Sequence, residues 1–183
     1  MTDETRITRQ ELSSEASNYA PSAIAMAAIE YAERGWPVFP APPGTKKSYL
    51  SKKHSGSNWG ASADVSWITR TFKKYPDANV GIVCGPSSGI IVIEADTVEG
   101  HGVDGIGNLA ALVDANSPLP ETVMAISPTG SVHYYFRLPE GVQIKNSTGQ
   151  IAAGVDVRGD GGMVIGVPSV KPGWPQPYRW LKS

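Results

Sequence analysis

Apolar and polar residues alternate in three short stretches of the chain, a pattern typical of β-strands. Polar side chains stand on alternate residues there: Glu94 and Asp96, Ser131 and His133, Asp156 and Arg158. Because successive side chains of a strand point to opposite faces, each pair shares one face of its strand. The residues of the other parity are apolar and are expected to form a core face: Ile91, Ile93, Ala95, Val132, Tyr134, Phe136, Val155 and Val157.

Three segments with apolar residues at helical spacing predict helices. The first begins after Ser22, a suitable N-cap, and stops at Gly35. The second begins after Asp64 and runs to about Tyr75, and the third covers about residues 105–115. Short apolar runs predict strands near residues 36–40, 80–84, 90–96, 122–126, 132–138, 154–158 and 163–167.

The order of these elements predicts an α+β fold, with helices packed on one face of a mainly antiparallel sheet. Residues 85–89, Gly-Pro-Ser-Ser-Gly, separate two of the expected strands and predict a hairpin. Residues 1–20 are polar and uneven in charge, which predicts a flexible N-terminal tail. Residues 21–183 are then expected to form one catalytic domain.

Composition limits the class of protein. The chain of 183 residues has one cysteine, Cys84, which excludes an internal disulfide and suits a reducing compartment. It has no run of about 18 apolar residues that could span a membrane, and residues 1–17 lack the apolar core of an export signal. We therefore expect a cytoplasmic protein that does not bind a membrane.

The net charge of −1 gives no general case for nucleic-acid binding, but the basic residues are clustered. They form two groups: Lys46, Lys47, Lys52 and Lys53, and then Arg70, Lys73 and Lys74. Solvated surface patches explain such groups equally well. Four tryptophans are candidates for stacking on bases, although any of them could be a core residue: Trp59, Trp67, Trp174 and Trp180.

The acids predict a divalent-metal site on the sheet. Several carboxylates on one face are electrostatically costly unless a cation neutralises them. Glu94 and Asp96 follow an apolar run, so they stand at the end of a buried strand, and Asp156 adds a third carboxylate. Such a set suits Mg²⁺ or Mn²⁺, including a pair of ions about 3.5–4 Å apart. Solvated strand-end acids and a structural pair between Asp156 and Arg158 remain alternatives.

Four further residues are candidates for phosphate binding. His133 follows a turn of small residues, and its imidazole, with the Ser131 hydroxyl, could bind a triphosphate. Arg158 shares the face of Asp156, and Lys47 lies in a loop rich in proline and glycine. The alternatives are a histidine that only contacts a neighbour and a surface lysine. His54 and His101 lie in expected loops and are interpreted as incidental.

Four segments, taken in order, resemble the N-terminal domain of bifunctional DNA primase/polymerases, the prim-pol domain of plasmid, phage and mobile-element replication proteins. They are residues 28–43, 79–96, 127–136 and 154–169, followed by Tyr178-Arg179-Trp180. The resemblance covers about residues 22–181. The sequence departs from the family at Glu94, where many members have aspartate, and in the loop 46–53, where Tyr49 and Leu50 stand in place of a common proline.

The resemblance implies an RRM-like catalytic sheet of the archaeo-eukaryotic primase type, flanked by helices. It implies Glu94, Asp96 and Asp156 as ligands of two divalent ions, and Ser131 and His133 at the incoming triphosphate. The expected activity is DNA-dependent primer synthesis and extension, with a single-stranded DNA template and dNTPs or NTPs, in a bacterial host.

Two other functions stay open from the sequence: a metal-dependent nuclease, and a catalytically silent RRM-like module that binds DNA or nucleotides. The chain has no GxxxxGK[ST] phosphate loop, so a helicase motor is expected in a longer chain or in a separate partner.

Overall fold

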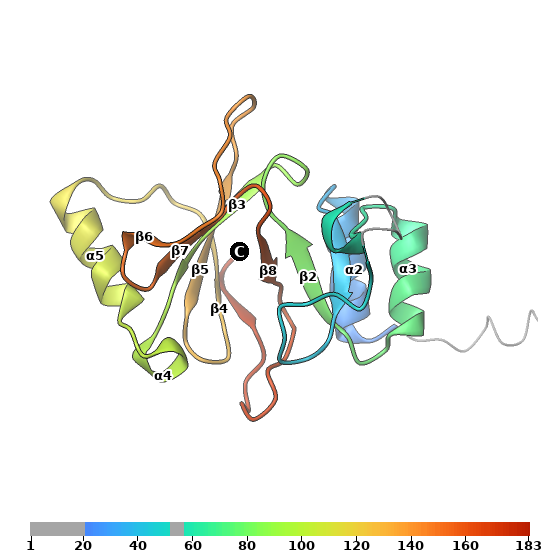
Figure 1. Ribbon diagram of the computed structural model, residues 1–183. Helices are drawn as coiled ribbons and strands as arrows, with labels where there is room; N and C mark the ends of the chain where they lie inside the picture. Colours follow the sequence, from blue (N-terminus) through green and yellow to red (C-terminus); the bar gives the residue numbers. More distant parts are fainter. Residues whose placement is uncertain (1–20, 52–56) are drawn as a thin grey trace, which may run out of the picture.

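The computed structural model describes residues 21–51 and 57–183. It contains two antiparallel sheets side by side, with helices toward both ends of the molecule (Figure 1). This confirms the predicted α+β class. The expected N-terminal tail, residues 1–20, lies outside the described residues, as do Lys52, Lys53 and His54. No helix in the described part of the chain is long and apolar enough to cross a membrane.

The three predicted helices are present with the caps that the sequence indicates. They are α2 (Ala23–Glu33), α3 (Val65–Lys74) and α5 (Gly105–Ala115). The Ser22 hydroxyl accepts a hydrogen bond from the Ala25 amide, and the Asp64 carboxylate accepts one from the Trp67 amide. The sequence did not predict two short helical turns, α4 (Val98–His101) and η2 (Asn58–Gly60).

The strands divide into a small sheet and a large one. The small sheet has the order β1 (Val38–Ala41), β2 (Asn79–Val83), β8 (Met163–Ile165). The large sheet has the order β6 (Ser147–Ala152), β7 (Val155–Arg158), β3 (Ile90–Ala95), β5 (Val132–Arg137), β4 (Val123–Ile126), β9 (Arg179–Lys182). Strands β6 and β9 were not predicted, because neither has an apolar run.

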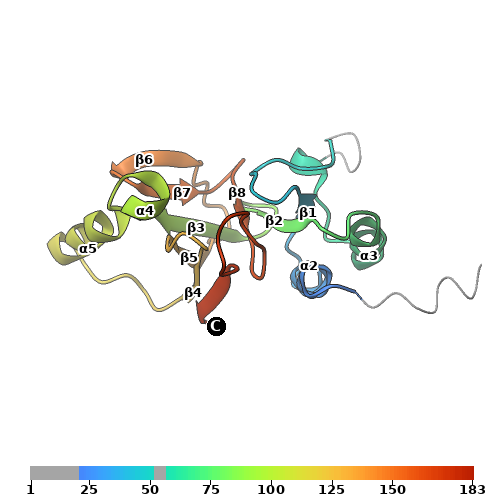
Figure 2. The ribbon, with the colours of Figure 1, turned by 90° about the horizontal axis from the view of Figure 1, so that it is seen from below.

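The predicted hairpin at residues 85–89 is wrong. Strands β2 and β3 belong to different sheets, and only an isolated bridge between Gly85 and Ile90 joins them. The turn therefore passes the chain from one sheet to the other. The helices are also not on one face of one sheet. Helices α2 and α3 pack against the small sheet, whereas α5 packs against β6, β7 and β3 (Figures 1 and 2).

The predicted core face of the large sheet is packed, but it forms the smaller core. Ala95, Val132 and Val155 on that face are buried, and Ile93 packs, half-buried, against the cluster that includes Leu109 of α5. The largest core cluster instead contains Ile90 and Val92, on the same face as Glu94. That cluster lies among α2, α3, the small sheet and this face of β3. The face that carries the acids is thus also a packing face.

Candidate active site

The structure places the predicted polar residues in rows across the three central strands of the large sheet. Glu94 on β3 lies opposite His133 on β5 and opposite Asp156 on β7. Residues directly opposite each other in paired strands share one face. All three are buried, and each exposes no more than 6% of its surface. The carboxylates therefore meet on one face of the sheet, as their parity in the sequence predicts.

Arg158 joins two of the acids. Its Nη2 lies 2.7 Å from Glu94 Oε2 and 2.6 Å from Asp156 Oδ2, and its Nε donates a second hydrogen bond to Glu94. Bidentate contacts of this kind between a guanidinium and carboxylates are the strong class of ion pair. Gly149 on β6 completes the set by donating its amide hydrogen to Asp156 Oδ1 at 2.9 Å. Strand β6, which the sequence did not predict, thus helps to orient Asp156.

Glu94 is surrounded by cationic groups. Lys46 Nζ lies 3.3 Å from its Oε1, on the side away from Arg158, and His133 Nε2 lies 3.4 Å from the same oxygen. Burial raises the pKa of Glu94, but His133, Lys46 and Arg158 together outweigh burial and hold that pKa well below its usual value. Glu94 therefore stays ionised across the neutral and mildly acidic range.

Asp96 is less well neutralised. Its Oδ1 accepts a hydrogen bond from the Ser131 hydroxyl at 3.2 Å and lies 3.4 Å from His101 Nε2. Burial and the charge of Glu94 raise its pKa above the usual value, against smaller opposing effects of His101 and Ser131. Asp96 is thus the carboxylate on this face that most lacks a cation.

The backbone of Asp96 is fixed by the start of α5. Its carbonyl accepts hydrogen bonds from the amides of Gly105 and Ile106, and its amide donates to Gly154 O. A Cβ on Gly105 would lie 2.0 Å from Gly154 O and 2.6 Å from the Asp96 nitrogen. Only glycine fits this contact, so Gly105 allows α5 to lock Asp96 in place.

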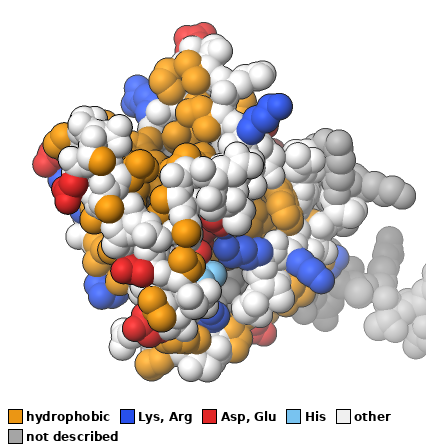
Figure 3. Space-filling view, turned by 60° about the vertical axis from the view of Figure 1, so that its left-hand side comes forward, with side chains coloured by type: hydrophobic (Ala, Val, Ile, Leu, Met, Phe, Trp, Pro, Cys, Tyr) orange, Lys and Arg blue, Asp and Glu red, His pale blue; other side chains and the backbone are white. Residues whose placement is uncertain are grey.

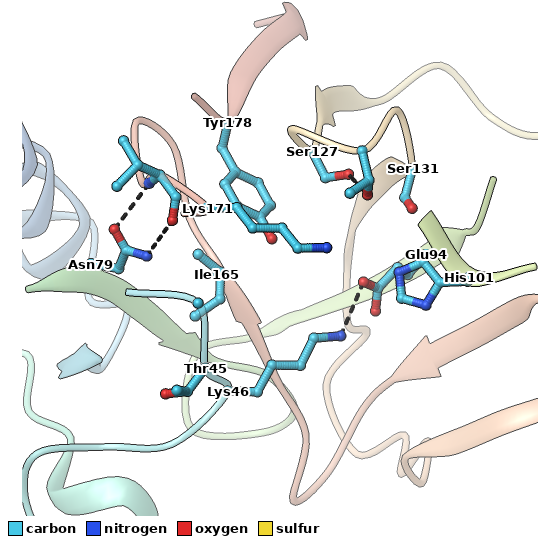
Figure 4. A pocket seen from close by; sticks show the side chains of 13 residues that line it. Thr45, Lys46, Asn79, Glu94, His101, Ser127, Ser131, Ile165, Lys171 and Tyr178 are labelled. Atoms are coloured by element: carbon cyan, nitrogen blue, oxygen red, sulfur yellow. Dashed lines mark hydrogen bonds and ion pairs between the residues drawn. The ribbon is translucent and has the colours of Figure 1, made fainter. Parts of the chain in front are cut away.

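Glu94 lines a pocket between the two sheets, and Asp96 contacts two other lining residues, Ser131 and His101. One wall comes from the large sheet and its turns, including Glu94, Ser131 and His101, and the other includes Lys46 and Lys171 (Figure 4). The close-up shows both lysine side chains extending toward Glu94. On the surface, basic, acidic and histidine side chains gather in one hollowed area (Figure 3). The cavity measures about 140 Å³, less than the ~300–1,000 Å³ of ordinary ligand pockets, so only part of a nucleotide would fit inside it.

The lysine wall is held by contacts between distant segments. The Asn79 side chain both donates to the Val170 carbonyl, at 2.7 Å, and accepts from the Val170 amide, at 2.9 Å. These two hydrogen bonds fix Val170 and, with it, the position of the next residue, Lys171. A Cβ on Gly44 would meet the Pro172 ring at 3.1 Å, so the loop that carries Lys46 packs closely on the segment that carries Lys171.

Tyr178 lines the pocket and meets the His133 ring edge-on, with centroids 5.8 Å apart. His133 Nδ1 is buried without a hydrogen-bond partner among the described residues, and Nε2 has the 3.4 Å contact with Glu94 Oε1. A buried donor or acceptor without a partner is costly, which favours a hydrogen bond to a bound ligand.

The structure changes three assignments of individual residues. Of the two adjacent lysines that the sequence offers for phosphate contact, Lys46 lines the pocket and Lys47 is exposed beside it. His101, interpreted as incidental, lies against Asp96. Lys171 and Tyr178 line the pocket although nothing in their local sequence marks them. The remaining predicted residues, from Glu94 to Arg158, are brought together, while their roles stay predictions.

The donor set suits a hard cation, but the acids are already engaged by side chains. Among residues 21–51 and 57–183, no three histidine, cysteine, aspartate or glutamate side chains are arranged to hold a metal ion. The reason is that Arg158 lies between Glu94 and Asp156, and Lys46 lies on Glu94. Asp96, by contrast, has only the Ser131 hydroxyl and His101 beside its carboxylate.

Comparison with known proteins gives one family. The model for the family described as bifunctional DNA primase/polymerase, N-terminal, matches residues 28–183. The match includes every residue of the candidate site. No curated protein matches the chain significantly.

Proposed function

The chain belongs to the bifunctional DNA primase/polymerase N-terminal family, and on that premise we propose that it is a DNA-dependent nucleotidyltransferase. In this proposal it synthesises and extends primers on a single-stranded DNA template in phage or plasmid replication. One observation carries the proposal: three carboxylates cluster on one sheet face, and the central one, Glu94, lines a pocket that also contains Lys46 and Lys171. Acids for cations and lysines for phosphates are the two requirements of phosphoryl transfer from a triphosphate.

The acids are proposed to hold two divalent ions, Mg²⁺ or Mn²⁺, through Glu94, Asp96 and Asp156. When bound, such ions activate the attacking hydroxyl and stabilise the leaving pyrophosphate. Arg158 orients Glu94 and Asp156, because it contacts both, and it helps to hold the pKa of Glu94 below its usual value. The Gly105 contact fixes the backbone of Asp96, and the Ser131 hydroxyl orients its carboxylate.

The opposite side of the pocket is proposed to bind the triphosphate. Lys46 is half exposed and neutralises Glu94 in the free chain; its flexible side chain turns to the phosphates once the carboxylate is bound to a divalent ion. Lys171 adds a second ammonium group from the same wall. Ser131 and His133 supply hydrogen bonds to the phosphate oxygens, and His133 Nδ1, which has no partner among the described residues, suits this role.

The test is an assay of primer extension and of de novo priming on single-stranded DNA, with Mg²⁺ or Mn²⁺ and with dNTPs or NTPs. Asp96→Ala combined with Asp156→Ala is expected to abolish both activities, whereas Arg137→Ala, an exposed residue outside the pocket, retains them. Synthesis by the double variant at the wild-type rate would refute the proposal. Metal-dependent shortening of DNA without nucleotides would point to a nuclease. If the chain neither synthesises nor shortens DNA, it would be a binding module.

A further inference from the structure

A second surface combines basic and aromatic side chains on the outer side of α3. Trp67, Arg70 and Lys74 recur at intervals of three and four residues, so they lie on one side of the helix. Together with Thr71, Leu50 and Tyr75 they line a hollow of about 210 Å³ that is separate from the pocket of the acids. The hollow shares no residue with that pocket.

The aromatic part of this surface is ordered before any ligand binds. The rings of Tyr49 and Tyr75 are stacked, with centroids 4.8 Å apart and planes at 11°. Lys74 Nζ lies 5.4 Å from the centroid of the Tyr75 ring, which is a cation–π contact. Tyr49 nevertheless exposes 44% of its surface. A rigid aromatic ring that stays open to solvent is suited to stacking on another flat group.

Helix α3 is basic although the chain as a whole is slightly acidic. Helix α3 carries three exposed basic residues, Arg70, Lys73 and Lys74, and no acid within its bounds. The nearest acids in the sequence are Asp64, which caps the opposite end of the helix, and Asp77, which follows it. With a net charge of −1 over the whole chain, this is a local concentration of positive charge.

One loop connects this surface to the proposed active site. The segment after β1 carries Lys46, which contacts Glu94, and three residues later Tyr49, which contacts Tyr75. Three residues span at most about 10 Å. In Figure 1 the same loop runs from the middle of the molecule toward α3. A ligand that follows this loop therefore passes from the aromatic pair to the pocket.

We propose that Tyr49, Tyr75, Arg70 and Lys74 bind single-stranded DNA and guide it toward the pocket. Basic side chains track the phosphates, and an open aromatic ring stacks on a base. Only unpaired bases offer a free face for stacking, so this surface selects a single strand over a duplex. The inference rests on the proposed function for the strand's role as the template.

The experiment measures binding of a fluorescently labelled oligo-dT by anisotropy, in EDTA and without nucleotides, over a range of salt concentrations. Arg70→Ala with Lys74→Ala is expected to lower affinity at least tenfold at low salt. It should also reduce the slope of log K against log salt by about 1.4, since each lost phosphate contact removes about 0.7. The matched control, Arg137→Ala with Lys145→Ala, removes the same charge elsewhere and should leave both quantities unchanged.

Tyr49→Leu separates stacking from charge. It should weaken binding about 5- to 100-fold, because a stacked base contributes that much, while the salt slope stays at its wild-type value. Duplex DNA of equal length should bind weakly to the wild type and show little effect of Tyr49→Leu. Equal loss for duplex and single strand would overturn the assignment to a single strand.

The two proposals can fail separately. Asp96→Ala with Asp156→Ala, which removes the proposed catalysis, should keep wild-type affinity for oligo-dT. If Arg70→Ala with Lys74→Ala binds oligo-dT like its matched control, the two basic residues only stabilise the C-terminal end of the helix dipole, and the inference is wrong. That result would stand whether or not the chain synthesises DNA.

Discussion

Replacing Lys46 by alanine should strengthen the binding of a divalent ion to the chain without nucleotide. Lys46 Nζ lies 3.3 Å from Glu94 Oε1, at a position where a cation bound to this carboxylate would compete with it. Glu94 is buried, so a positive neighbour stabilises its ionised form. Removing the lysine leaves the carboxylate available to a metal ion.

The expected size of the effect follows from the geometry. At 3.3 Å and an effective dielectric constant of about 20, the gross Coulomb energy is about 5 kcal/mol. The lysine side chain is 50% exposed, and solvent and side-chain entropy reduce exposed pairs to about 0.2–1 kcal/mol net. With the upper figure, because the carboxylate is buried, the apparent affinity for Mn²⁺ should rise about fivefold.

The assay is calorimetric titration of Mn²⁺ into the wild type, Lys46→Ala and Lys47→Ala without nucleotide. Lys47 is the matched control, because it is the exposed neighbour and makes no ion pair among the described residues. Lys46→Ala should also bind a dNTP more weakly once the metal is saturating, since it loses a phosphate contact. If Lys46→Ala binds Mn²⁺ no more tightly than Lys47→Ala, the lysine does not occupy a metal position and the reasoning fails.

Three further substitutions test the electrostatics and packing around the acids. Asp96→Asn should raise the free energy of unfolding at pH 7, because burial and Glu94 raise the Asp96 pKa and make its ionised form costly. In urea unfolding this gain should vanish toward pH ~4, where Asp96 is protonated in the folded and the unfolded chain. A gain that is constant with pH would contradict this. Arg158→Ala should cost about 3–5 kcal/mol in urea unfolding, since it leaves two buried carboxylates without their shared partner; a loss under 1 kcal/mol would show that the pair is solvated. Gly105→Ala should lower both thermal stability and primer extension more than Gly107→Ala, whose new methyl group meets only the Asp104 side chain; equal effects would rule out the backbone contact.

The sequence was sufficient to predict the acids and the pair of Asp156 with Arg158, but not the other partners of the acids. Alternation within a strand depends only on local geometry, so the shared face of Glu94 and Asp96 and the parity of Asp156 could be predicted. The caps Ser22 and Asp64 were predictable for the same reason. Lys46 and His101 reach their carboxylates from a loop and a short helical turn, whose positions depend on tertiary packing that no local pattern encodes.

The division into two sheets also lay beyond local pattern. Residues 85–89 have the composition of a hairpin turn, and Gly85 does bond to Ile90. The strands on either side diverge because each finds other partners: β2 pairs with β1 and β8, and β3 pairs with β5 and β7. Strand pairing over long sequence separations decided this, and turn chemistry alone cannot.

The packing of strand β3 on both of its faces explains how the site works. Residues 90–93 are apolar at every position, a pattern typical of a strand packed on both faces, so a single core face was too simple an expectation. Ile90 and Val92 continue the largest core cluster up to Glu94, where the packed face opens into the pocket. The carboxylates therefore stand at the edge of a low-dielectric region, where each charge requires a neighbour. In the free chain that neighbour is Arg158 or Lys46. The same requirement is what would draw a divalent ion and a triphosphate to this face.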